Sequence, residues 1–395
     1  MNWEAREQVI HYSKGGRKME KSAKCKMLIV LILAVALIIV GAKNIAAEEP
    51  VKFGSLVMLT GFLATPGLDM QRGEQIAAEE INAAGGVLGR KLELIYEDTE
   101  SRSEQAVEGV RKLIDINKVK IVIGTYSSWS GLATGAITNK RHILQMAVAP
   151  TSPQMRKVGP YFFNMSATDD VLAPKLSRGA FKVTGAKRWG SIIQNDPFGI
   201  GIEVHTCKAV EELGGECVVK VRFEHGEKDF RPELQRLFAV KPEAVFFTSQ
   251  GEDAKLLLKQ IYELGLKPPK GYWADYMTMW SSDAIPETAE GIRGWVAGAQ
   301  AATHYIARYK EKYGEAPLTV WGAYAYDAVW TVSMAVNYAH TTDPEVLKDV
   351  LPLIARRYKG VTGDKTFDKD GMQGDEEIRW MIYHNGKLVP YDIEK

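Results

Sequence analysis

The sequence lacks the short motifs by which many enzymes are recognised. It has no Gly-x-x-x-x-Gly-Lys-Ser/Thr phosphate loop, no Gly-x-Gly-x-x-Gly after its first predicted strand, and no Gly-x-Ser-x-Gly nucleophile elbow. Its seven histidines show no metal-ligand spacing such as His-Glu-x-x-His. Ser128, Asp196 and Asp275 could be imagined as nucleophile, acid and base, but no histidine is positioned to activate the serine. We therefore expect a protein that is not an enzyme and uses no metal or other cofactor.

Cysteine is scarce, with three residues in 395. Cys25 precedes an apolar run, so it is in the wrong place to be a lipid-modified cysteine that follows a signal sequence. Cys207 is expected in the middle of a helix and Cys217 at the start of the next strand, which favours Cα atoms too far apart to bridge. We interpret both as small buried apolar residues, with a disulfide formed in an oxidising compartment as the alternative.

Long apolar segments are equally scarce. The run at residues 27–40 is shorter than the roughly 20 residues of a membrane-spanning helix. It follows a basic stretch and precedes small residues, which is the order of a secretory signal peptide. We predict a signal peptide over residues 1–47 and an exported protein, with an uncleaved anchor as the alternative. The remaining residues carry 42 basic and 46 acidic side chains, which argues against nucleic acid as a partner.

From residue 51 onward, patterns of strands and helices alternate with short breaks. The alternation restarts after about residue 168, which indicates two similar units built in succession. Strand–helix repeats of this kind form parallel sheets with helices on both faces. The sequence therefore predicts an α/β fold of two doubly wound, Rossmann-like lobes. The predicted strands of the first unit are residues 51–58, 91–97, 119–124 and 142–148, and its predicted helices include 67–84 and 103–117.

Small hydroxyl residues follow two of these predicted strands. Gly-Thr-Tyr-Ser-Ser-Trp-Ser-Gly occupies 124–131, and Gln-Met-Ala-Val-Ala-Pro-Thr-Ser-Pro-Gln occupies 145–154. The carboxyl ends of strands in open α/β sheets are where ligands bind. Ser127, Ser128, Thr151 and Ser152 are thus expected to present hydroxyl and backbone N–H groups to a small anion, such as a carboxylate. Taken alone, the serine pair at 127–128 is more typical of a cap on the following helix.

Several short pieces of the chain together resemble a known family. They include Thr60-Gly61, then Ile-Asn-Ala-Ala-Gly-Gly-Val-Leu-Gly-Arg-Lys-Leu at 81–92 and Asp-Pro-Phe-Gly-Ile-Gly at 196–201. Gly-Glu-Lys-Asp-Phe at 226–230 and Thr-Gly at 362–363 follow. In this order and spacing, residues 51–390 resemble the periplasmic substrate-binding proteins of branched-chain amino-acid ABC importers, the Leu/Ile/Val-binding type.

This resemblance implies two lobes joined by a three-segment hinge, with crossings near 166–167, 296–298 and 360–362. The first lobe would comprise residues 51–166 plus 297–360, and the second 167–296 plus 361–395. Such a protein works in the periplasm or at the outer face of the membrane. It traps a small-molecule ligand as the lobes close, and delivers it to an ABC permease driven by its ATPase.

The resemblance also implies roles for individual residues. Ser128, Ala149 and Thr151 match the positions that hold the ligand carboxylate, and Asp275 falls where an acid commonly holds the ammonium group. A carboxylate facing an ammonium in a dry cleft forms a charge-assisted hydrogen bond. We therefore expect an amino acid as the ligand. The adjacent Ser127 is included in the predicted site.

Three departures from the family argue against the expectation that the ligand is a branched-chain amino acid. Phe198 stands where a tyrosine is frequent, Pro66 stands at another tyrosine position, and residues 250–251 lack the family's aromatic residue. A different side-chain pocket would be built from Tyr126, Trp129, Tyr276 and Phe62. The alternatives are the same fold binding an amide, urea or an aromatic carboxylate, or a ligand sensor that reports to a separate receptor.

Overall fold

The computed structural model describes residues 48–275, 279, 286–297 and 302–394. The predicted signal peptide at 1–47, Tyr276 and position 298 of the predicted hinge lie outside these residues. Within them, no helix is both long and apolar enough to cross a membrane. The compact unit described below runs from Pro50 to the C-terminus.

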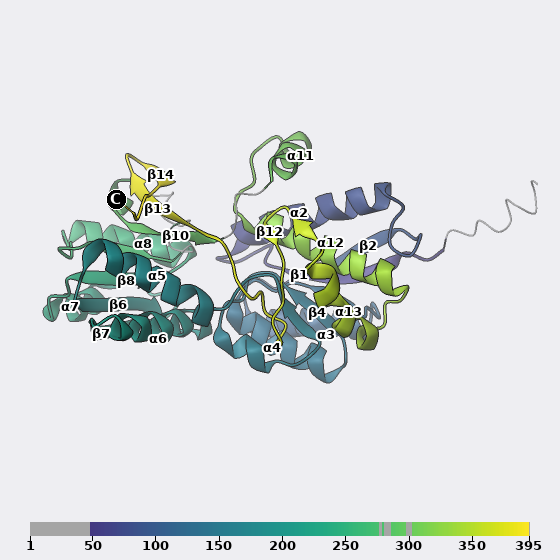
Figure 1. The fold of residues 1–395 in the computed structure, drawn as a ribbon, viewed down its shortest axis with the longest axis horizontal. Helices are drawn as coiled ribbons and strands as arrows, with labels where there is room; N and C mark the ends of the chain where they lie inside the picture. The colour runs from purple at the N-terminus through teal and green to yellow at the C-terminus, as the bar shows by residue number, and fades with distance from the viewer. Residues whose placement is uncertain (1–47, 276–278, 280–285, 298–301, 395) are drawn as a thin grey trace, which may run out of the picture. The chain divides into compact units, whose positions relative to one another are not determined.

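A five-stranded parallel sheet forms the centre of the first lobe (Figure 1), the name used here for this sheet and its helices. The strand order β2-β1-β3-β4-β5 places β1 between its sequence neighbour β2 and the later β3, as in doubly wound folds. The predicted alternation is confirmed. The elements are β1 (Val51–Val57), α2 (Ala64–Ala83), β2 (Leu92–Asp98), α3 (Ser103–Asp115), β3 (Ile121–Ile123), α4 (Ser128–Lys140), β4 (Leu144–Ala147), η1 (Pro153–Lys157) and β5 (Phe162–Asn164).

A seven-stranded sheet forms the centre of the second lobe, in the order β14-β13-β10-β9-β8-β6-β7. Strands β6 to β10 run parallel, whereas β13 and β14 extend the sheet as an antiparallel pair. The elements are α5 (Asp169–Thr184), β6 (Arg188–Gln194), α6 (Pro197–Glu212), β7 (Glu216–Phe223), α7 (Arg231–Ala239), β8 (Ala244–Thr248), α8 (Gly251–Glu263), β9 (Tyr272–Ala274), α10 (Pro286–Ala289), β10 (Arg293–Ala297), β13 (Ile378–His384) and β14 (Lys387–Pro390).

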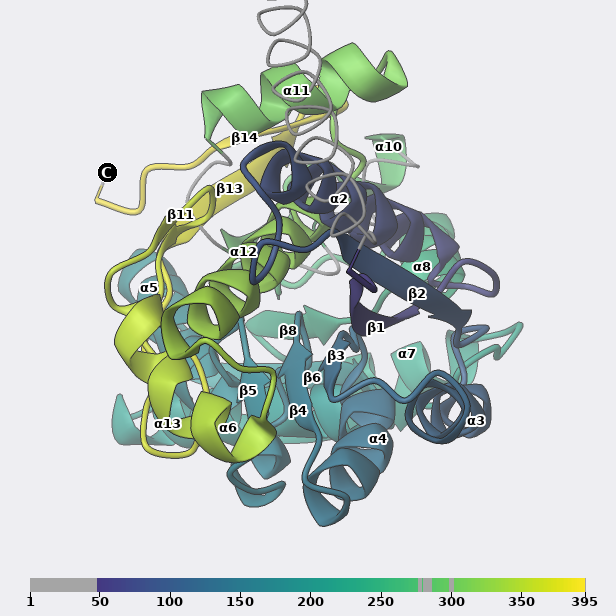
Figure 2. The same ribbon diagram turned by 90° about the vertical axis from the view of Figure 1, so that its right-hand side faces the viewer.

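The chain returns to the first lobe after β10. Helices α11 (Thr303–Tyr313), α12 (Trp321–Ala339) and α13 (Pro344–Ala355) follow, and α12 packs along α2 (Figure 2). A Cβ atom at Gly73 would lie 1.8 Å from the carbonyl oxygen of Gly322, so the two helices approach so closely only because residue 73 has no side chain. The buried Asp69 accepts backbone N–H bonds from Leu318 and Gly322, which fixes the start of α12 against α2.

The segment after α13 stays on the first lobe before it reaches β13. Its short strands are β11 (Lys359–Gly360) and β12 (Gly363–Asp364). Asn164 of β5 and Met372 form an isolated parallel bridge, and the guanidinium of Arg156 pairs with Asp170 and Asp368. Figure 1 shows this segment in yellow as it runs between the two lobes.

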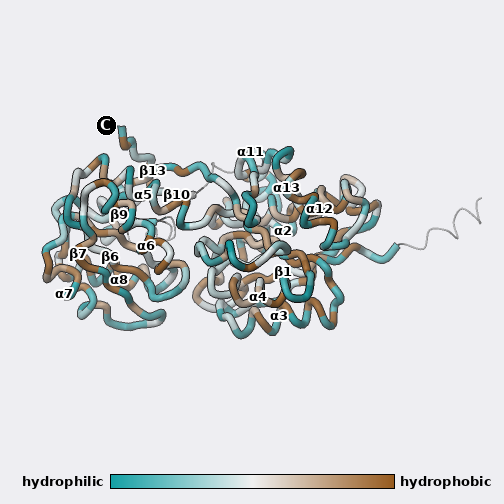
Figure 3. The backbone as a smooth tube through the Cα atoms, turned by 60° about the horizontal axis from the view of Figure 1, so that its bottom comes forward, coloured by the Kyte–Doolittle hydropathy of each residue, from teal (hydrophilic) through white to brown (hydrophobic). Residues whose placement is uncertain are grey.

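One main cluster of buried apolar residues extends through both lobes. Figure 3 shows hydrophobic residues distributed through both lobes rather than gathered in one run. Trp189, Trp273 and Trp295 are buried in the second lobe, and Phe53 and Trp321 in the first.

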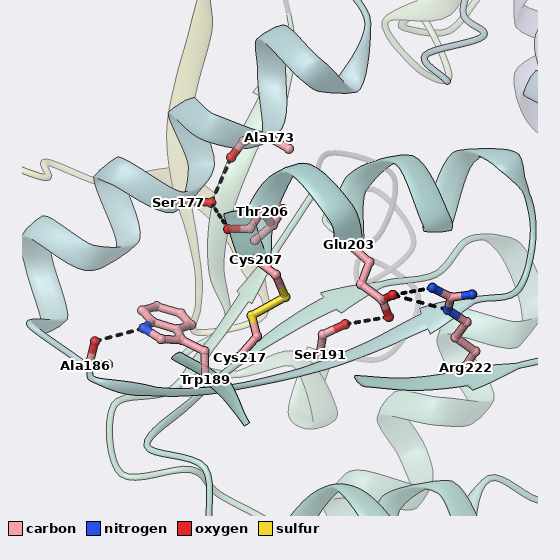
Figure 4. The surroundings of a disulfide bond; sticks show 10 residues. All are labelled: Ala173, Ser177, Ala186, Trp189, Ser191, Glu203, Thr206, Cys207, Cys217 and Arg222. Atoms are coloured by element: carbon pink, nitrogen blue, oxygen red, sulfur yellow. Dashed lines mark hydrogen bonds and ion pairs between the residues drawn. A yellow bond between two sulfur atoms is a disulfide. The ribbon is translucent and has the colours of Figure 1, made fainter. Parts of the chain in front are cut away.

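Cys207 and Cys217 form a disulfide, so the interpretation of two unpaired cysteines is wrong. Cys207 does lie within α6 and Cys217 does open β7, but their Cα atoms are 5.6 Å apart, inside the usual range for a bridge. The tight turn at Gly214, whose φ is +79°, returns the chain directly alongside α6. Figure 4 shows the bond between helix and strand, beside the buried Trp189.

Candidate functional site

The two loops predicted to bind a ligand lie at the carboxyl ends of β3 and β4, which are neighbours in the sheet. Residues 124–127 connect β3 to the first turn of α4, and Ala149 and Thr151 follow β4 directly. Ser127 is the N-cap residue of α4, but its side chain makes no capping hydrogen bond. The hydroxyl of Ser128 accepts a hydrogen bond from the backbone N–H of Ser152, 3.1 Å away, which ties the two loops together.

These loops face the second lobe across a narrow cavity, which in this structure has room for little more than a water molecule. Of the eight predicted site residues, every one except Asp275 lines it. The lining residues are Tyr126, Ser127, Ser128, Trp129, Ala149, Thr151, Phe198 and Gln250.

Phe198 and Gln250 supply the second lobe's side of this cavity. Phe198 lies in the first turn of α6, whose N-terminus is fixed by Asp196 as its cap through a 2.8 Å bond from the N–H of Gly199. Gln250 precedes α8 at the carboxyl end of β8. The sequence marked residues 250–251 only as a departure from the family. The strand-end position of Gln250 was the signal that could have placed it in the site.

Asp275 is fully buried at the carboxyl end of β9. It does not line the cavity, but it lies close to residues that do. Burial, and after it the charge of Asp275, raises the pKa of the Tyr126 phenol. The charge of Asp275, which lies in the second lobe, therefore acts on the ligand loops of the first lobe.

Asp169 is a second buried acid that the sequence analysis missed. It is the first residue of α5 and is fully buried, and its carboxylate lies beside the buried hydroxyl of Thr151. Burial, together with the nearby charge of Asp275, raises the pKa of Asp169 well above its ordinary value. A buried carboxyl group with no paired cation is disfavoured in its charged form.

Gly201 shows how close Asp169 lies to the second lobe's helix α6. A Cβ atom at position 201 would be 2.5 Å from Oδ2 of Asp169. The pattern of small residues at 199 and 201 was part of the family resemblance, yet nothing in it pointed to residue 169. The site therefore combines neutral donors on β3 and β4 loops with two buried acids, Asp169 and Asp275. No cluster of metal-ligating side chains occurs among the described residues.

The chain is similar to known proteins over most of its length. The family model described as "Periplasmic binding protein" matches residues 50–384. An "Amino acid binding protein" of Pseudomonas aeruginosa is 28% identical over 349 residues, which cover 86% of this chain and 92% of that protein. The crystal structure of a leucine binding protein, LivK, from Thermotoga maritima superposes with a TM-score of 0.79 at 25% identity, covering 87% of this chain and 98% of the other.

A second solved structure is a branched-chain amino acid transporter substrate binding protein, LivJ, from Streptococcus pneumoniae, in complex with isoleucine. It superposes with a TM-score of 0.76 at 25% identity and covers 86% of this chain and 98% of its own. Both similarities extend over nearly the whole of the described residues, so they concern the two lobes together.

Proposed function

Because this chain belongs to the family of periplasmic binding proteins, we propose that it traps an amino acid between its two lobes for an ABC importer. The observation that carries the proposal is the pair of buried acids beside a cavity whose lining is otherwise neutral. Asp169 is buried beside the hydroxyl of Thr151 and makes no ion pair with a described residue, and a ligand ammonium would supply the missing cation. The amino-acid and isoleucine-binding relatives support the same class of ligand.

In the proposed pose, the ligand carboxylate accepts hydrogen bonds from the loops of the first lobe. Ser128 and Thr151 provide hydroxyl groups, and Ala149 provides a backbone N–H at the carboxyl end of β4. The N-terminus of α4, which begins at Ser128, adds a favourable dipole for an anion. The ammonium group, which is attached to the same carbon atom as the carboxylate, faces Asp275 and Asp169; Asp169 lies beside Thr151.

The ligand side chain then contacts the aromatic part of the cavity. Tyr126, Trp129 and Phe198 form this part, and Ser127 and Gln250 add polar groups at its margin. Phe198 keeps the ring of the family's frequent tyrosine but has no hydroxyl to donate. We therefore propose a small or apolar side chain, with a branched-chain amino acid as one candidate.

Closure of the lobes would bury the ligand, because residues of both lobes line the cavity. We propose that the lobes move about three crossings, near 166–167, at 296–298 and in the C-terminal segment. Asn164 pairs with Met372, and Thr362 donates hydrogen bonds to Asp327 of α12. These contacts favour a third crossing after residue 373 rather than at 360–362.

The family also bears on where the protein works. We propose that residues 1–47 direct its export and that the closed form docks on an ABC permease, which its ATPase drives. The bond between Cys207 and Cys217 supports an oxidising compartment.

A thermal-shift screen against amino acids, amides, urea and aromatic acids tests the proposal. A ligand far above its dissociation constant raises the unfolding midpoint. The wild-type protein should respond to amino acids. Asp275→Asn should abolish the shift caused by amino acids, because it removes the partner of the ammonium group. Any shift caused by benzoate, which has no positive charge, should be reduced less. Asp349→Asn is the matched control, because the Asp349 side chain is 79% exposed. Shifts with amides or aromatic acids alone would overturn the amino-acid pose.

A further inference from the structure

Three rings from both lobes meet beside the cavity. Phe62 precedes α2 and Trp129 lies in the first turn of α4, whereas His225 follows β7 in the second lobe. The ring centroid of His225 is 5.1 Å from that of Phe62 and 5.4 Å from that of Trp129. Phe62 and Trp129 are themselves stacked at 6.2 Å. Since Trp129 also lines the cavity, this contact joins the lobes at the cavity's edge.

Two carboxylates of the second lobe hold the His225 ring in place. Its Nε2 atom lies 3.0 Å from Asp196, and its Nδ1 atom lies 3.0 Å from Asp253. An imidazole that donates from both nitrogens carries a proton on each and is therefore a cation. Burial lowers the pKa of His225, but the hydrogen bonds and charges of Asp196 and Asp253 outweigh it and raise the pKa to about 9.

Both carboxylates are themselves fixed by the backbone of the second lobe. Asp196 caps α6 through the N–H of Gly199, and Asp253 in the first turn of α8 accepts from the N–H of Gly226. His225 is thus a preorganised cation on the second lobe. The faces of aromatic rings attract cations within about 6 Å, so the two rings of the first lobe are suitable partners.

The backbone closes the same edge of the cavity. A Cβ atom at Gly251 would lie 3.0 Å from the carbonyl oxygen of Phe62. The second lobe therefore approaches Phe62 through a glycine at the start of α8 as well as through His225.

We infer that His225 is a positioning residue for ligand capture, which on closure holds Trp129 against the ligand and slows its escape. The inference rests on the proposed function, because it concerns how a trapped ligand is retained. Phe62, Trp129 and His225 form what we call the interlobe clasp. The clasp acts through the indole of Trp129 and not through direct contact of His225 with the ligand.

The test uses the purified protein with L-leucine as the probe and two readouts. The first is the fluorescence emission of Trp129. It is obtained by subtracting the emission of a Trp129→Phe protein from the emission of the same protein with Trp129 in place. A protonated imidazole in contact with an indole quenches its emission, so His225→Phe should raise it. The second is the rate of L-leucine dissociation in stopped-flow measurements, which His225→Phe should increase about tenfold with little change in the association rate.

Two further variants keep the test decisive. Phe62→Ala removes a ring that is 38% exposed and leaves the second lobe intact, so it should also speed dissociation even if His225→Phe folds poorly. His304→Phe is the matched control, because His304 is exposed on α11, and it should change neither readout.

Each outcome decides one of the two claims. If L-leucine binds but His225→Phe changes Trp129 emission neither with nor without it, the clasp is overturned and the proposed function stands. If L-leucine and the other amino acids fail to bind while His225→Phe still raises the emission, the contact between His225 and Trp129 stands, but the proposed ligand class and the role of the clasp in retaining an amino acid both fail. If neither effect occurs, both are overturned.

Discussion

Removal of the disulfide should destabilise the protein by an amount set by the length of chain it closes. The perturbation is the double variant Cys207→Ala/Cys217→Ala, which removes both sulfur atoms. The two cysteines are separated by 10 positions in the sequence. Closing a loop of this size removes conformational entropy from the unfolded chain equivalent to about 3 kcal/mol at 25 °C.

Urea unfolding followed by far-ultraviolet circular dichroism measures this loss. The double variant should be less stable than the wild type by about 3 kcal/mol, and the wild type in excess reductant should lose a similar amount. The double variant is also the control for the reductant, because it has no bond left to reduce, and it should unfold alike with and without reductant. The reasoning would be refuted if the double variant and the reduced wild type both unfold at the same urea concentration as the oxidised wild type.

Three further predictions concern other buried groups. Burial raises the pKa of Glu74 to about 8 from an ordinary value near 4.5, so its contribution to stability is present below pH 4.5 and is lost as the pH rises to about 8. The wild type should therefore lose about 3.5 kcal/mol of stability between pH 5 and pH 8 in urea unfolding, and Glu74→Gln should abolish this loss. Equal pH dependence in both proteins would contradict the prediction. Gly73→Ala should cost about 3 kcal/mol, because its Cβ would clash with the backbone of Gly322, and an unchanged melting temperature would disprove the close packing of α2 on α12. Asp169→Asn should leave the melting temperature unchanged or raise it, yet weaken amino-acid binding by about tenfold or more in calorimetry; a variant that binds normally would exclude Asp169 from the site.

Much of the fold could be predicted because its signals are local. Apolar runs such as residues 119–123, followed by small hydroxyl residues, specify a buried strand and the loop at its end without reference to distant residues. Ser128 and Thr151 follow from this pattern and do line the cavity together.

The missed features depend on how elements distant in sequence are placed. Asp169 looks like an ordinary first-turn acid at a helix start, and only its burial beside Thr151 and Asp275 makes it a candidate ligand-binding residue. His225 lies in a loop of polar residues, and nothing in that loop reveals that it meets Phe62 and Trp129 of the other lobe.

The α/β architecture, the two successive units and the strand-end loops follow from the sequence alone, because the periodicity of apolar residues and the placement of turn residues act within a few positions. Three other features follow only from how the elements pack: Cys207 meets Cys217, two acids are buried beside one cavity, and the lobes touch through His225. Those outcomes depend on the path of the turn at Gly214 and on contacts between separate lobes. Such geometry is set by the packing of whole elements and not by the residues on either side of each position.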